Sequence, residues 1–243
     1  MASPLDLLKT SFNLFKKHFV YLLVFWLIDF GLTLAAFIPL IIIAVTTGMF
    51  AAISHAIPHL NTLLPTLIYI PVLILLLLWF STSLTVQLNA VGQDQRSPFR
   101  QLFSVGWQKT WPMLVLSLSA GFLTTLGFVL FIVPGLIFSV WFSFAGPVII
   151  NEHLGAFASM GRSKSLIKGR FWTAVKYLIL PFLVSLAYSL LTSVALGPVP
   201  LAKSLASLLY IPLQLILGVY SFQVYFAFRD HPVSGSQQLS ANS

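Results

Sequence analysis

The chain has 243 residues, of which 58% are hydrophobic and only 7% are charged. Because a soluble domain carries about 25% charged residues, this composition excludes a water-soluble globular fold. The sequence contains no cysteine, which excludes disulfides, cysteine-ligated metal sites and thiol catalysis.

Six apolar runs predict six transmembrane helices, since a spanning helix needs about 20 mostly apolar residues. The runs cover residues 19–45, 64–90, 112–133, 136–151, 171–195 and 205–228. The first run is too long for a signal-peptide core, so we expect it to be retained as a span. The fourth run is short, so we expect the turn before it to lie earlier than Pro134-Gly135.

The predicted fold class is therefore an all-α polytopic membrane protein. A transmembrane β-barrel would instead show alternating strands of about 10 residues. We expect residues 1–230 to form a single six-span domain, and the Ser- and Gln-rich residues 231–243 to form a disordered cytoplasmic tail.

Lysine and arginine residues fall almost entirely on one side of the predicted spans. That side carries Lys9, Lys16, Lys17, Arg96, Arg100, Lys109, Arg162, Lys164, Lys168, Arg170, Lys176 and Arg229, and the other side carries Lys203. The positive-inside rule then predicts a multi-pass protein of the bacterial cytoplasmic (inner) membrane with both termini in the cytoplasm. The same bias explains the net charge of +8 without a nucleic-acid partner.

The basic segments form a weak internal repeat. SFNLFKKHF (Ser11–Phe19) and SKSLIKGRF (Ser163–Phe171) share Ser, Leu, Lys and Phe at the same offsets, and His18 corresponds to Arg170. WQKTW (Trp107–Trp111) is a looser third copy. Since each copy precedes two apolar runs, the pattern suggests three units, each with a short basic amphipathic interfacial helix and a transmembrane hairpin.

The stretch RSKSLIKGRFW, residues 162–172, is the most basic of these segments. Beside an anionic leaflet, each Lys or Arg contributes about 1 kcal/mol of attraction, and the aromatic residues that follow would lie at headgroup level. The segment is either a topology signal alone or a site for an anionic lipid headgroup or phosphate. The candidate residues for such a site are Arg162, Lys164, Lys168, Arg170, Trp172, Lys16, Lys17 and Lys109.

Residues 131–152 (FIVPGLIFSVWFSFAGPVIINE) and 155–172 (GAFASMGRSKSLIKGRFW) carry a family pattern. They resemble the membrane domain that precedes some bacterial glycerophosphoryl diester phosphodiesterases, and the related YciC-like uncharacterised inner-membrane proteins. The matching positions are Pro134, Gly135, Pro147, Glu152, Ser163, Gly169, Arg170, Phe171 and Trp172, whereas Ser159 and Lys164 depart from the pattern. The resemblance implies a membrane module linked to envelope or lipid homeostasis, without the phosphodiesterase domain.

Four residues of this pattern are expected to be structural: Pro134, Gly135, Glu152 and Gly169. We predict that Glu152 pairs with Arg162 or Arg170 and so fixes the basic helix to the bundle.

Polar side chains inside the apolar runs suggest a second class of function, a small transporter or channel. Asp29 is the only acid well inside a run, and Lys176 is its obvious counterpart. They form a coupling or proton site, or the role is structural, as a buried ion pair or as a protonated Asp29 bonded to neighbouring backbone. Two stripes at helical spacing, Ser81, Thr85 and Asn89 and then Ser185, Ser189 and Ser193, either let helices pack closely or line a polar path.

An enzyme is disfavoured because the chain has five acidic residues, no paired carboxylates and no cysteine. We predict no cofactor and no metal site, since Pro58 lies between His55 and His59 and no carboxylate is near them. The primary prediction is a non-enzymatic module whose partners are anionic membrane lipids, with a protein partner or a second copy of the chain left open.

Overall fold

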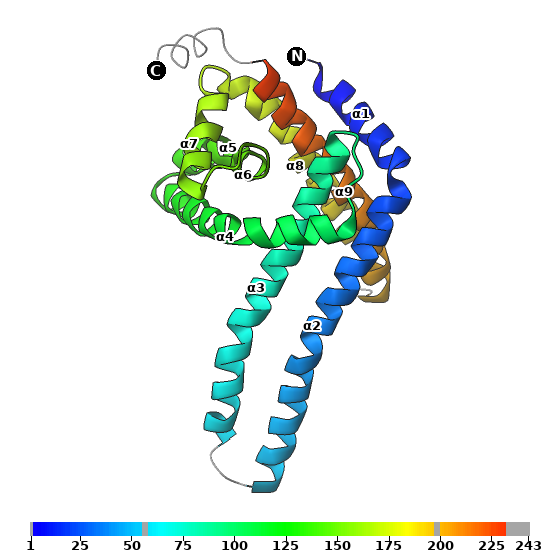
Figure 1. The fold of residues 1–243 in the computed structure, drawn as a ribbon, viewed down its shortest axis with the longest axis vertical. Coiled ribbons are helices and arrows are strands. Elements are labelled where there is room, and N and C mark those ends of the chain that lie inside the picture. The colour runs from blue at the N-terminus through cyan, green and yellow to red at the C-terminus, as the bar shows by residue number, and fades with distance from the viewer. Residues whose placement is uncertain (1, 55–57, 197–199, 232–243) are drawn as a thin grey trace. The chain divides into compact units, whose positions relative to one another are not determined.

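The computed structural model describes residues 2–54, 58–196 and 200–231. Within these ranges the chain forms nine α-helices and no strand (Figure 1). The helices are α1 (Pro4–Lys17), α2 (Phe19–Ser54), α3 (Pro58–Gly92), α4 (Phe99–Leu130), α5 (Ile132–Phe142), α6 (Ala145–Glu152), α7 (Ala156–Ile167), α8 (Phe171–Leu196) and α9 (Pro200–Asp230).

Six segments are long and apolar enough to cross a bilayer, which confirms the predicted all-α polytopic fold. They are Phe19–Pro39, Tyr69–Gly92, Phe99–Leu130, Ile132–Glu152, Phe171–Val194 and Tyr210–Asp230. The turn before the fourth span lies at Phe131, whose backbone is extended with φ −160° and ψ 148°. It therefore precedes Pro134-Gly135, as predicted.

The chain divides into two compact units. Unit 1 comprises Met1–Phe19, Leu88–Arg96 and Pro112–Ser243, and unit 2 comprises Val20–Gln87 and Ser97–Trp111. The prediction of a single domain over residues 1–230 stays a prediction. The predicted disordered tail falls, from residue 232 onward, outside the described residues.

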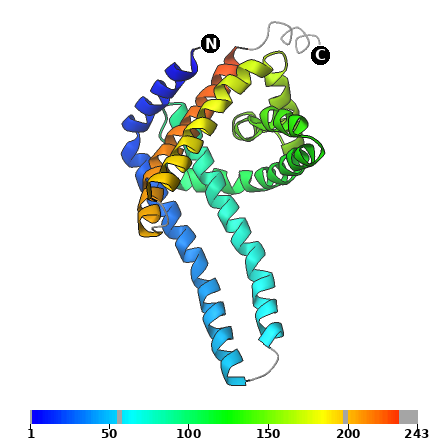
Figure 2. The same ribbon diagram turned by 180° about the vertical axis from the view of Figure 1, so that it is seen from behind.

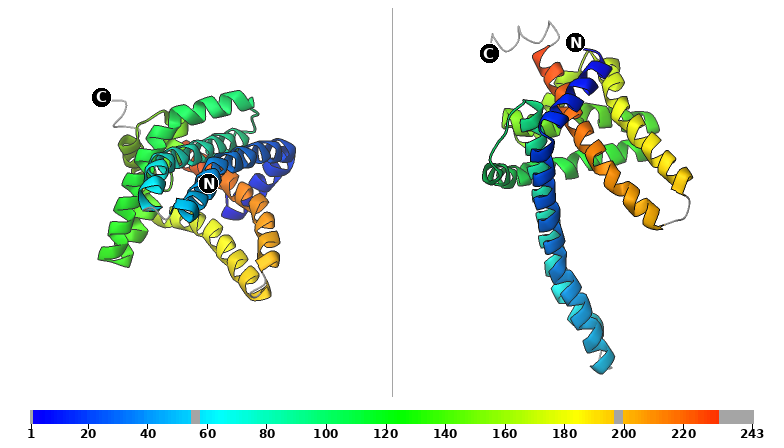
Figure 3. Two further views of the ribbon diagram at one scale, coloured as in Figure 1. Left: turned by 90° about the horizontal axis from the view of Figure 1, so that it is seen from below. Right: turned by 90° about the vertical axis from the view of Figure 1, so that its right-hand side faces the viewer.

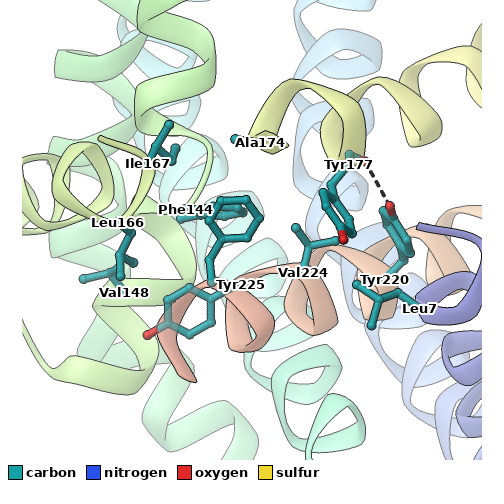
Figure 4. Close-up of a cluster of buried hydrophobic side chains, with 11 residues drawn as sticks. Leu7, Phe144, Val148, Leu166, Ile167, Ala174, Tyr177, Tyr220, Val224 and Tyr225 are labelled. Carbon is teal, nitrogen blue, oxygen red and sulfur yellow. Dashed lines mark hydrogen bonds between the residues drawn. The ribbon is translucent and has the colours of Figure 1, made fainter. Parts of the chain in front are cut away.

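In unit 1, α9 packs against several other helices. It contacts α1, α8 and α7, and α5 and α6 pack against α7 (Figures 1 and 2). Five of the eleven residues in the buried cluster here are aromatic. Helix α9 contributes Tyr220 and Tyr225, which are labelled in Figure 4, and Phe228. The Tyr220 hydroxyl donates to the backbone carbonyl of Tyr177 at 3.0 Å, which joins α9 to α8. Figure 3 shows α8 and α9 as a hairpin from two further directions.

Helix α1 forms because its start is capped and one face is apolar. Ser3 and Asp6 make a reciprocal capping box, and Pro4 occupies the first turn, where its missing N–H costs nothing. Leu7, Ser11 and Phe15 follow at intervals of four and are buried. The first predicted basic amphipathic helix is therefore a separate helix in the structure.

The second copy of the repeat is also a separate helix, α7, but the third is not. Residues 107–111 lie inside α4, which continues without a break from Phe99 to Leu130. A break needs a residue that leaves helical backbone, as Gly169 does after α7 with φ 81°. No such residue occurs at the third copy, and Pro112 is accommodated within the helix. The helix-plus-hairpin layout is thus found in two of the three predicted units.

In unit 2, α2 and most of α3 run in opposite directions (Figure 1), and an aromatic cluster joins them to the first turns of α4. The Trp79 indole N–H donates to the Phe103 carbonyl at 2.9 Å, and the Phe25 and Phe103 rings stack at 5.2 Å. Gly106 permits the close approach of α4 to α3, since a Cβ there would lie 2.1 Å from Ser83 Oγ.

Candidate lipid-binding surface

The fourth span is interrupted between α5 and α6, and α7 is fastened to the interruption. Phe144 has a non-helical backbone, with φ −97° and ψ 0°. The hydroxyl of Ser163, which is fully buried, donates to the Trp141 carbonyl at 2.5 Å and accepts from the Phe144 N–H at 3.1 Å. Backbone groups inside a membrane protein need internal partners, so Ser163 supplies what the broken helix lacks.

A second tie joins α6, α7 and α9 through one carboxylate. Glu152 Oε2 accepts from Arg162 Nε at 2.8 Å, and Glu152 Oε1 accepts from the Tyr225 hydroxyl at 3.1 Å. The predicted ion pair of Glu152 is therefore present, and its partner is Arg162. The side chains are 42% exposed for Arg162 and 22% for Glu152, so this pair is partly shielded from solvent.

Arg170 lies where the last turns of α7 and α9 meet. Its Nη2 donates to the carbonyls of Leu166 at 3.1 Å and Phe228 at 2.9 Å, and Nη1 donates to the His231 carbonyl. The guanidinium also lies 4.6 Å from the centre of the Phe228 ring. A cation at helix C-termini satisfies carbonyls that have no partner within the helix.

Burial lowers the pKa of the Arg170 guanidinium from its ordinary value. The group nevertheless stays charged, since the arginine guanidinium is not deprotonated in proteins. Its Nε is buried without a hydrogen-bond partner among the described residues. Gly169, with φ 81°, provides the turn that brings Arg170 back onto these helix ends.

The remaining cations of this segment are exposed. In the described part of the chain, Lys164, Lys168 and Lys176 form no ion pair. Lys164 Nζ lies 4.2 Å from the centre of the Trp141 ring, and the Trp172 side chain is 76% exposed. We call Lys164, Lys168, Trp172 and Lys176 the basic edge.

The basic residues of the first copy are used differently. Lys17 pairs with Asp94, and His18 Nε2 lies 2.8 Å from the other Asp94 oxygen. The Arg96 Nε donates to His18 Nδ1 at 3.2 Å, and Lys16 Nζ lies over the Phe12 ring at 4.5 Å.

Hydrogen bonds from Lys17 and then His18 hold the pKa of the Asp94 carboxyl below its usual value. Lys109, the candidate from the third copy, is half-buried and belongs to unit 2. Of the eight candidates, Arg162 and Arg170 therefore tie helices together, and Lys17 is paired with Asp94. A lipid site formed by these residues stays a prediction.

Sequence reasoning missed the polar contacts around the end of α3. Asn151 of α6 donates to Asn89 Oδ1 at 2.8 Å and accepts from Gln93 Nε2 at 3.1 Å. Asp94 has φ 57°, a left-handed conformation that Asp tolerates better than most residues. The signal that could have revealed this turn is the run Gly92 to Asp94, which is polar and follows directly on an apolar helix.

The candidates for transport are not brought together by the described contacts. Asp29 Oδ1 is buried and has no hydrogen-bond partner among the described residues. Asp29 lies in unit 2 and Lys176 in unit 1, so their pairing stays a prediction.

The two polar stripes differ in their surroundings. Asn89 is tied to α6 in unit 1, whereas Ser81 and Thr85 belong to unit 2. Ser185 is half-buried, whereas Ser189 and Ser193 are exposed. Both interpretations of the stripes, close helix packing and a polar path, remain predictions.

A metal site finds no support in the described ranges, where no group of three or more His, Cys, Asp or Glu residues could hold an ion. His55 lies outside these ranges.

Comparison with known proteins shows that the chain is similar to bacterial membrane proteins. No protein-family model and no solved structure matches it. A UPF0259 membrane protein of Yersinia pestis (strain Pestoides F) and one of Yersinia pseudotuberculosis serotype O:3 (strain YPIII) are each 33% identical to it over 135 residues. The match covers 52% of this chain and 49% of each relative, so the chain spans about half the length of the curated relatives it matches.

These relatives support the general part of the family resemblance. Neither of the two names mentions a phosphodiesterase or any other enzymatic activity, so the link to glycerophosphoryl diester phosphodiesterases stays a prediction. With its six apolar helices and these relatives, the chain is a multi-pass bacterial membrane protein similar to an uncharacterised membrane-protein family.

Proposed function

We propose that the protein is a non-enzymatic module of the bacterial cytoplasmic (inner) membrane, with both termini in the cytoplasm. It binds anionic lipid headgroups through the basic edge and serves envelope or lipid homeostasis. The observation that carries the proposal is the different use of the cations in residues 162–172. Arg162 and Arg170 hold helices together, whereas the side chains of Lys164, Lys168 and Trp172 are exposed.

Lys164 and Lys168 are both available to an outside anion, since their side chains are exposed. Their ammonium groups form no ion pair with the described residues. Lysine at an anionic leaflet gains about 1 kcal/mol of attraction, and tryptophan favours the headgroup region. The combination of Lys164, Lys168 and Trp172 therefore suits a phosphate-bearing headgroup.

Native mass spectrometry of the full chain in mixed micelles tests this proposal. We expect the wild type to retain phosphatidylglycerol in preference to phosphatidylcholine. The double variant Lys164→Gln/Lys168→Gln should bind phosphatidylglycerol roughly 30-fold more weakly, which corresponds to about 2 kcal/mol for two charges.

The matched control is Lys9→Gln/Arg100→Gln, which removes the same total charge from two exposed positions elsewhere. It should retain most of the binding. An equal loss in both double variants would show that only net charge matters, and the proposal would then be wrong.

The alternative is a small transporter or channel. One observation favours it: Asp29 Oδ1 is buried and has no hydrogen-bond partner in the part of the chain that the structure describes. Ionisable groups within spans commonly mark ion or proton pathways. Proteoliposomes that enclose a pH-sensitive dye provide the test. A proton flux that Asp29→Asn abolishes would support transport, and a flux equal to that of protein-free vesicles would refute a proton pathway.

A further inference from the structure

An apolar groove of about 600 Å³ separates α5 from α8 within unit 1. Leu136 and Val140 line it from α5, and Val175, Ile179 and Phe182 line it from α8. The groove therefore offers contact to hydrocarbon along both walls.

Two serines at the groove do not change its apolar character. Ser139 Oγ donates to the Leu136 carbonyl at 2.8 Å, and Ser143 Oγ donates to the Val140 carbonyl at 2.8 Å. Both hydroxyls are thus bonded to their own helix. A polar occupant would find few partners here, whereas an apolar chain would find continuous contact.

The length of the groove matches one leaflet of a bilayer. Its α8 wall extends from Phe171 to Phe182, eleven residues apart. At a rise of about 1.5 Å per residue this is about 16 Å, roughly half of the ~30 Å hydrocarbon core. One acyl chain extends through one leaflet, so a single chain fits this depth.

The mouth of the groove lies at the basic edge. Trp172 belongs both to the groove and to the edge, and Lys176 follows it by four residues on α8, one helical turn along. Lys164 reaches α5, since its ammonium lies over the ring of Trp141, a residue of α5 that does not itself line the groove. The one acid close in sequence, Glu152, is already paired with Arg162, so the charge at this mouth is positive.

We infer that the groove between α5 and α8 holds one acyl chain of an anionic phospholipid whose headgroup lies on the basic edge. This inference rests on the proposed function and adds to it a defined place for the lipid tail. A chain that enters the groove leaves other hydrocarbon and not water, so it gains no hydrophobic free energy. The groove therefore fixes the position of the lipid, and the lysines select its headgroup.

The absence of native cysteine allows the groove to be blocked after folding. Val175→Cys can be labelled on the purified protein with a bulky apolar thiol reagent, so that the label fills the groove without affecting folding. Leu191→Cys, carrying the same label, is the matched control because Leu191 is exposed on α8 outside the groove. Bound phosphatidylglycerol and phosphatidylcholine are then counted by native mass spectrometry before and after labelling.

We expect labelling at Val175→Cys to lower retained phosphatidylglycerol several-fold, with little change at Leu191→Cys. If the label has no effect while Lys164→Gln/Lys168→Gln still lowers binding, the groove inference is wrong and the proposed function stands. If neither change lowers binding, both fail. Equal retention of phosphatidylcholine would indicate ordinary surrounding lipid and would overturn the inference.

Inorganic phosphate distinguishes a lipid site from a phosphate site. Added as a competitor to the wild-type protein in the same micelles, it should displace little phosphatidylglycerol, because it has no chain to occupy the groove. Complete displacement by phosphate, together with unchanged binding after labelling, would assign the site to free phosphate and overturn the inference.

Discussion

Replacing Ser163 by Ala should destabilise the protein by about 1–3 kcal/mol. The hydroxyl is fully buried, and it partners both the Trp141 carbonyl and the Phe144 N–H at the break between α5 and α6. Cross-helix side-chain hydrogen bonds in membrane proteins average about 0.6 kcal/mol and reach about 1.7 kcal/mol. Two such bonds give the expected range, and the orphaned backbone groups favour its upper end.

Ser11→Ala is the matched control, because Ser11 occupies the same place in the repeat and is also fully buried. Its hydroxyl donates to the Leu7 carbonyl of its own helix at 2.7 Å, and that carbonyl keeps its helical partner after the substitution. We expect a loss below about 0.5 kcal/mol for this variant. Unfolding by SDS in micelles, followed by tryptophan fluorescence, measures both free energies. A Ser163→Ala loss no larger than that of Ser11→Ala would refute the role assigned to Ser163.

Two further variants probe the α4–α5 turn and the end of α3. Gly135→Ala should lower the free energy of unfolding by about 1–3 kcal/mol in the same assay, because a Cβ there would lie 2.4 Å from the Phe128 ring. Its control is Gly121→Ala, which should not lower it, because a Cβ at Gly121 meets nothing within 4 Å. The hydrogen bond from Lys17 is the main cause of the lowered pKa of the Asp94 carboxyl. The ionised Asp94 therefore stabilises the folded state. This stabilisation is complete above the unfolded-state pKa of about 3.9 and is lost as the pH falls through the folded-state pKa. Asp94→Asn should therefore be less stable at pH 7 and lose less stability than wild type between pH 5 and pH 3; parallel pH profiles would contradict this.

The spans could be predicted from sequence because the bilayer imposes one rule on every helix, a length of apolar chain. The same rule could not reveal the break at Ser143-Phe144, since the hydropathy of Ile132–Glu152 as a whole is that of one span. That break depends on Ser163, which lies 19 residues after Phe144 and supplies the missing hydrogen bonds. Hydropathy records the environment of a segment and contains no information on such a tertiary partner.

The candidate lipid site was predicted only in part, for a similar reason. Sequence treats the four cations of residues 162–172 as equivalent, but their surroundings separate them. Arg162 and Arg170 find a carboxylate and helix-end carbonyls, which suit a planar guanidinium with several donors. Lys164 and Lys168 remain exposed. The choice between Arg and Lys could thus have indicated which cations bind within the protein, whereas a count of positive charges treats all four alike.

The two repeat copies that form separate helices show how one local pattern serves two purposes. In each, a fully buried serine and a chain break precede an aromatic residue that begins a span, Phe19 or Phe171. At the position before this aromatic residue, His18 binds the Asp94 carboxylate, whereas Arg170 binds helix-end carbonyls. Both side chains therefore bind groups within the protein. These contacts within the protein explain His18 and Arg170 without any ligand. A lipid site therefore has to be sought in Lys164, Lys168 and Lys176, which form no ion pair with the described residues.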